Sequence, residues 1–209
     1  MPKEMNHRRD ADQLVQIVDA ALASSVERSG THLGCRIGCT QCCHGVFPIS
    51  QQDADRLRDA LQALEQTDPH QATRIRNRTS ESLARVALLF PGDLVTGTLN
   101  QDYGDAPLFA DEDSIGDNEP CPVLDPTTGT CDLYAARPVV CRTFGPPMRT
   151  PEGDLATCEL CFIHASTEEI IAAELDPTIP EREAASNQTF NSANNTHGET
   201  IIAFALRNS

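Results

Sequence analysis

Four cysteines fall within nine residues near the start of the chain, in the segment CRIGCTQCC over residues 35–43. Cys39 and Cys42 form a C-x-x-C pair, the spacing that lets one tight turn present two thiolates to one metal ion. Cys43 follows directly, and adjacent side chains point in different directions, so it more readily serves a second metal ion or another iron of a cluster. Cysteines that only pack a core are usually scattered singly among apolar neighbours. The cluster therefore predicts metal chemistry.

Five further cysteines lie between residues 121 and 161. Cys121 and Cys131 flank a turn-rich connector over residues 125–129, so a small hairpin is expected to bring them together. Cys158 and Cys161 form a second C-x-x-C pair. The candidate metal ligands are Cys35, Cys39, Cys42, Cys43, Cys121, Cys131, Cys141, Cys158 and Cys161.

Eight thiolates would fill two four-thiolate sites and leave one thiol over. A four-thiolate zinc site carries a net charge of about −2, so it needs N–H donors and cations around it. Arg36, Arg137 and Arg142 lie within a few residues of a cysteine and are candidates for that role; ordinary surface salt bridges are the alternative. With nine thiols available, His44 and His164 are expected to stay outside the ligand set.

Metal ligation is favoured over disulfides. The first ten residues are polar and charged and lack the apolar run of a secretory signal. No stretch approaches the ~18 apolar residues that would span a bilayer. The chain is therefore expected to be cytoplasmic, where structural disulfides are disfavoured, and its nine cysteines cannot all pair within one chain.

The formal charge of −15 argues against a phosphate-binding surface, and hence against nucleic-acid partners. The arginines of residues 74–85 are expected to form a solvated face with internal ion pairs. Metal or cluster is the expected partner, with a protein partner possible.

A mainly α fold is expected, as a small irregular helical domain with a short β-hairpin, stapled by cysteine-ligated metal. Apolar periodicity predicts a helix over 10–28 and further helices over about 51–66, with Ser50 as N-cap, and 70–89. Pro138 opens a helical turn, and helices around 166–175 and 198–207 close the chain. The expected domains are an N-terminal helix (1–30), a cysteine-cluster metal-binding domain (31–165) with a helical insert (50–90) and an acidic loop (91–120), and a C-terminal helical extension (166–209).

A family resemblance rests on three spaced motifs: Cys35-x3-Cys39-x2-Cys42-Cys43, Cys121-Pro122-x-Leu124, and Cys131-x-Leu133-Tyr134-x2-Arg137-Pro138-x2-Cys141-Arg142. Over about residues 33–165 they resemble the YkgJ-type cysteine-cluster family, which carries a CxxCxxCC motif and is described as zinc- or iron-chelating. The resemblance implies a metal but no settled activity. The family commonly has two residues in its first pair, where this chain has three, so Cys35 and Cys158 are the candidates for the surplus thiol. Some members are described as iron–sulfur oxidoreductases, and a related domain occurs in a flagellin lysine methylase; no SAM-binding glycine loop is present here, so methylation is not carried over.

The expected function is chelation of iron, as an iron–sulfur cluster, or of zinc through eight to nine thiolates. The alternatives are an iron–sulfur redox enzyme and a zinc-stabilised interaction module without catalysis. Closed C-x-x-C pairs suit zinc, whereas the vicinal cysteines and the Cys121-Pro122 step are reminiscent of iron–sulfur sites, to which the balance leans slightly. No cysteine is marked as an activated nucleophile with an orienting histidine, so no catalytic residue is assigned.

Overall fold

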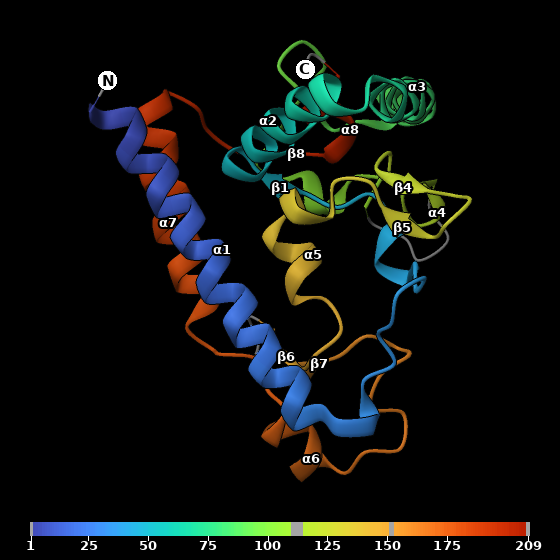
Figure 1. Ribbon diagram of the computed structural model, residues 1–209, viewed down its shortest axis with the longest axis vertical. Helices are drawn as coiled ribbons and strands as arrows, with labels where there is room; N and C mark the ends of the chain where they lie inside the picture. Colours follow the sequence, from blue (N-terminus) through green and yellow to red (C-terminus); the bar gives the residue numbers. More distant parts are fainter. Residues whose placement is uncertain (1, 110–114, 151–152, 208–209) are drawn as a thin grey trace. The chain divides into compact units, whose positions relative to one another are not determined.

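The computed structural model describes residues 2–109, 115–150 and 153–207 (Figure 1). This part of the chain is mainly helical and carries four two-stranded antiparallel sheets. The mainly α class with short hairpins, expected from the sequence, is thereby confirmed. None of the helices in the described part is long and apolar enough to cross a membrane.

The chain forms two compact units, each built from two segments. Unit 1 comprises Met1–Arg36 and Val139–Asn194, and unit 2 comprises Ile37–Pro138 and Asn195–Ser209. The three domains expected from the sequence (1–30, 31–165 and 166–209) remain a prediction.

Unit 1 is organised around the long helix α1 (Pro2–Ser29), which lies along α7 (Ile179–Asn194) (Figure 1). Buried Val18, Val139 and Ile179 belong to the apolar cluster that joins these helices to α5. The Ser25 hydroxyl donates to the carbonyl oxygen of Ala173 at 2.5 Å, which fastens α1 to the end of α6. The other elements of unit 1 are η1 (Gly30–His32), α5 (Val139–Thr143), β6 (Met148–Arg149), β7 (Leu155–Ala156) and α6 (Thr167–Ala172).

Helix α7 was not predicted from the sequence, in which residues 181–197 were interpreted only as a polar run. Its N-terminal Ile179 is its one buried residue among those described. A helix that is anchored at one end and polar elsewhere has no apolar stripe from which periodicity could detect it.

Unit 2 packs α2 (Gln51–Thr67), α3 (Pro69–Val86) and α8 (Ile202–Leu206) against one another. Strand β1 (Ile49–Ser50) pairs with β8 (Glu199–Thr200) and leads directly into α2. The Ser50 side chain accepts from the Asp53 N–H at 3.1 Å, so the predicted N-cap is confirmed. Phe90 and Phe204, 4.2 Å apart between ring centroids, lie in the core of this unit.

Residues 91–120 contain short elements that the sequence did not predict. They are β2 (Gly92–Asp93), paired with β3 (Thr98–Leu99), then η4 (Tyr103–Asp105) and α4 (Ile115–Asn118), and they follow η3 (Ala87–Leu89). Elements of two to four residues leave no periodic signature. The acidic residues Asp111, Glu112 and Asp113, expected in a solvated loop, lie outside the described residues.

Candidate metal centre

The predicted hairpin between Cys121 and Cys131 is confirmed in unit 2. Strand β4 (Leu124–Asp125) pairs with β5 (Thr130–Cys131), and Leu124 lies opposite Cys131. The connecting turn ends at Gly129, whose φ of +67° suits glycine. The sequence signal was sufficient here because turn residues stand directly between the two short extended segments.

The first cysteine cluster lies against this hairpin. Cys42 and Cys43 belong to the 3₁₀ turn η2 (Gln41–Cys43). The Cys121 N–H donates to the carbonyl oxygen of Cys43 at 2.8 Å. A Cβ atom on Gly129 would lie 3.4 Å from the carbonyl oxygen of Gly38, so the hairpin turn touches the loop that carries Cys39. Two segments far apart in the sequence therefore meet within unit 2.

The thiols of four cysteines interact electrostatically at this meeting point. The hydrogen bond with Cys42, then burial, and then the nearby charges of Cys42, Cys121 and Cys131 raise the pKa of Cys43 far above its ordinary value. A hydrogen bond from the Cys43 thiol lowers the pKa of Cys42 from 9.0 to about 6. Burial raises the pKa of Cys121 to about 12 and also raises the pKa of Cys131. The group thus holds its first negative charge on Cys42, and a further thiolate needs a compensating cation.

One arginine supplies positive charge to these thiols. Arg137 follows η5 (Tyr134–Ala136), and its guanidinium lies 4.2 Å from the centroid of the Tyr134 ring. Its charge lowers the pKa values of Cys42 and Cys131. Arg142 instead pairs with Asp19 at 2.6 Å in unit 1; this is a salt bridge, but the Arg142 side chain is buried and so it is not the ordinary surface pair considered as the alternative.

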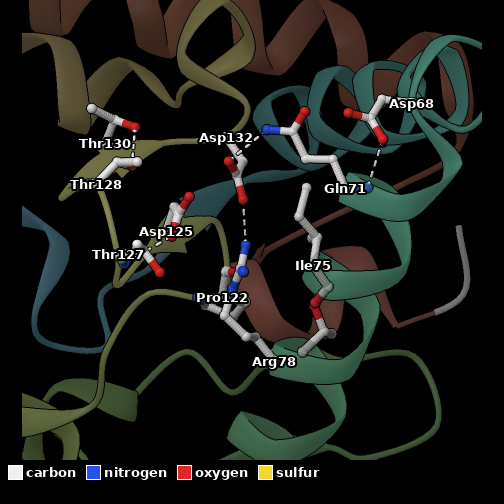
Figure 2. A network of polar contacts seen from close by, with 11 residues as sticks. Asp68, Gln71, Ile75, Arg78, Pro122, Asp125, Thr127, Thr128, Thr130 and Asp132 are labelled. Atoms are coloured by element: carbon white, nitrogen blue, oxygen red, sulfur yellow. Dashed lines mark hydrogen bonds and ion pairs between the residues drawn. The ribbon is translucent and has the colours of Figure 1, made fainter.

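A second arginine holds the hairpin to α3, as Figure 2 shows. Arg78 donates to the carboxylate of Asp132 at 2.5 Å and to the carbonyl oxygen of Pro122 at 2.7 Å. These two residues directly follow Cys131 and Cys121 in the sequence. The Gln71 amide also donates to Asp132, at 2.6 Å. The internal ion pairs expected for this arginine-rich helix are present, but their bearing on the cysteines was not visible in the sequence.

The remaining thiols lie in unit 1. Cys158 and Cys161 are buried, in an apolar cluster with Phe162 and Ala173, whereas Cys35 is exposed and Cys141 is half-buried on α5. The Gly34 N–H donates to the Cys161 sulfur at 3.3 Å.

The structure divides the cysteines differently from their order along the chain. Unit 2 contains five of them and unit 1 contains Cys35 together with the three that follow residue 138. His44 and His164 are both exposed. In the part of the chain that the structure describes, no three His, Cys, Asp or Glu side chains converge closely enough to hold one metal ion. The ligand set therefore stays a prediction.

The family model for CxxCxxCC, described as "Putative zinc- or iron-chelating domain", matches residues 34–193. The chain belongs to this family. The match includes all nine cysteines. No curated protein and no solved structure matches the chain.

The residues gathered in unit 2 fit a thiophilic metal by their donor chemistry. Thiolates are the protein ligands that zinc and iron–sulfur clusters share. The backbone link between Cys43 and Cys121 and the cation at Arg137 are of the kind that orients thiolates and offsets their charge around a metal.

Proposed function

We propose that the chain chelates iron, as an iron–sulfur cluster, or zinc, through thiolates of its cysteines. In unit 2 the ligands are drawn from Cys39, Cys42, Cys43, Cys121 and Cys131. The observation that carries the proposal is geometric: the Cys121 N–H donates to the Cys43 carbonyl at 2.8 Å, and the β4–β5 hairpin brings Cys131 to the same place within one compact unit.

The residues around the thiols have separable tasks. Arg137 offsets the negative charge of Cys42 and Cys131, and Arg78 contributes positive charge toward Cys121. The Cys43 carbonyl fixes the Cys121 backbone. When bound, the metal supplies the remaining positive charge and, if it is a cluster, one-electron redox capacity.

The vicinal pair Cys42–Cys43 favours iron–sulfur over zinc at this centre. Two adjacent side chains do not readily occupy two corners of one tetrahedron, but they can bind two irons of one cluster. A zinc-stabilised interaction module is the alternative. A redox activity would follow only from the cluster, through a partner protein.

The test is elemental analysis with a visible absorption spectrum, on protein purified without oxygen. Wild-type protein is compared with Cys121→Ser and with the control Thr130→Ser, which keeps the hydroxyl that contacts Thr128. We expect a brown wild-type protein with iron and acid-labile sulfide, both reduced in Cys121→Ser and retained in the control. A colourless protein with zinc lost in Cys121→Ser would favour the zinc alternative. Full metal content in Cys121→Ser would refute the proposed centre, as would well-folded wild-type protein without either metal.

A further inference from the structure

A cleft lies within unit 2 where four segments of the chain meet. Its walls come from residues 45–47, from Ser82 on α3, from residues 119–122 before the β4–β5 hairpin, and from residues 201–203 at the start of α8. The Gly45 N–H donates to the Glu119 carbonyl at 2.9 Å, and the Val46 N–H donates to the Gly116 carbonyl at 2.7 Å. These backbone hydrogen bonds hold two of the walls together, so the cleft is built into the fold of the unit.

The walls of the cleft are mainly apolar. Val46 and Phe47 contribute half-buried side chains, and Ile201 and Ile202 contribute buried ones. The space measures about 290 Å³, including the part that is open to solvent. Pockets for drug-sized ligands measure about 300–1,000 Å³. The cleft therefore suits a smaller molecule with an apolar body.

Ser82 adds a hydroxyl group to this apolar lining. The residue is only 2% exposed, and its hydroxyl makes no hydrogen bond with any residue in the described part of the chain. The neighbouring hydroxyls of α3 differ: those of Thr79 and Ser80 donate to the carbonyl oxygens four residues earlier, at 2.9 and 3.0 Å. Buried hydroxyls usually have a hydrogen-bond partner, so Ser82 is suited to bond with a molecule in the cleft.

The carboxylate in the wall of the cleft is already neutralised. Glu119 is 5% exposed, and its two oxygens accept from the Arg85 guanidinium at 2.8 and 2.7 Å. A charged ligand would leave water for apolar walls without gaining an unpaired counter-charge from the residues that line the cleft, which is unfavourable. The formal charge of −15 further disfavours anions. The cleft therefore selects for uncharged molecules.

We propose that this cleft binds a small, uncharged, largely apolar molecule that carries one hydroxyl group, and that this group forms a hydrogen bond with Ser82. Cys121 also lines the cleft, so the bound molecule lies beside a cysteine of the unit 2 centre. Such a site adds the binding of an organic ligand, which metal chelation does not include. The binding itself does not rest on the proposed function, because the apolar walls and Ser82 recognise the molecule without a metal.

The test uses phenol as the probe, titrated into the full chain as purified and followed by saturation-transfer NMR of the ligand. Toluene, in which a methyl group replaces the hydroxyl, is the matched second probe. We expect wild-type protein to bind both at one saturable site, where they compete. Ser82→Ala should weaken phenol binding about 3- to 10-fold, the effect of one neutral hydrogen bond, and should not weaken toluene binding. The control Ser80→Ala, at an exposed position of the same helix, should change neither dissociation constant.

Three results would overturn the proposal. Phenol might show no saturable binding to wild-type protein, or toluene might fail to compete with it; both results come from wild-type protein and need no variant. The third is that Ser82→Ala binds phenol as wild-type protein does, or loses affinity for phenol and toluene equally. The variant is expected to fold, because alanine is the most favourable residue in a helix, and circular dichroism checks this. Metal content is measured on the same samples, so a failure of chelation is distinguished from a failure of phenol binding.

Discussion

Among the residues that are not cysteines, Arg78 is expected to contribute most to the stability of the β4–β5 hairpin in unit 2. Its partner Asp132 has a side chain only 4% exposed, and Arg78 itself is 19% exposed. Removing one partner of a buried ion pair costs about 3–5 kcal/mol, because the other charge stays buried and uncompensated. The Gln71 amide remains on Asp132 and reduces the penalty. We therefore expect Arg78→Ala to lower the free energy of unfolding by about 2–4 kcal/mol.

The same helix provides a matched control. Arg76 pairs with Glu65, and these two side chains are 32% and 33% exposed. Ion pairs of that exposure contribute about 0–1 kcal/mol, so Arg76→Ala should be nearly silent. The assay is urea unfolding followed by circular dichroism, on metal-free protein so that metal affinity does not enter the measured free energy.

A double-mutant cycle identifies the cause. In the Arg78→Ala background, Asp132→Asn removes the stranded charge, and part of the lost stability should return. The reasoning would be refuted if Arg78→Ala and Arg76→Ala differed by less than about 1 kcal/mol, the upper value for an exposed pair. It would also be refuted if Asp132→Asn gave no recovery. Because Arg78 holds Pro122 and Asp132, metal binding at the unit 2 centre should weaken about 10-fold as well.

Three further outcomes are expected. Anaerobic chelation should lower the midpoint of the calorimetric melt, because a structural metal stabilises the folded state that binds it by ~10–16 kcal/mol. An unchanged midpoint would contradict the metal staple. In metal-free protein, alkylation of Cys42, followed by mass spectrometry, should reach half its maximal rate near pH 6, because the pKa of Cys42 is lowered from 9.0 to about 6. Cys121 should react only in strong alkali, because its pKa is raised to about 12. The contribution of the Cys42 thiolate to the free energy of unfolding is then complete above about pH 9 and is lost as the pH falls through about 6. If the alkylation rate of Cys42 instead had its midpoint near pH 9, the hydrogen bond with Cys43 would be absent. Ser50→Ala should lower the free energy of unfolding in urea by about 1 kcal/mol, because the N-cap of α2 is lost. The control is Ser80→Ala, at an exposed position within α3, and equal effects of the two substitutions would contradict the prediction.

Local signals in the sequence were enough for the elements that they encode directly. Ser50 and Asp53 specify the start of α2 through one side-chain hydrogen bond. The turn before Gly129 specifies the β4–β5 hairpin, and with it the proximity of Cys121 and Cys131. These features depend on residues a few positions apart, where backbone geometry leaves few choices.

The assignment of each cysteine to a unit could not be read in the same way. Cys35 and Cys39 are neighbours in the sequence, yet they belong to different compact units. The Cys35 sulfur lies against Gly145, a glycine at positive φ more than a hundred residues further on. Likewise, Arg78 looks like any surface arginine of a charged helix until the fold brings Asp132 to it. Such long-range pairings are set by tertiary packing, for which a single sequence carries no periodic signal.

The boundary between the two units falls inside the first cysteine cluster, between Arg36 and Ile37. This is where the chain has three residues between its first two cysteines instead of the family's common two. Gly38, within that spacer, has a φ of +87°, a backbone conformation that residues with a side chain rarely adopt. A chain that must deliver Cys35 to one unit and Cys39 to the other needs such a turn between them. The longer spacer therefore lies where the chain passes from unit 1 to unit 2.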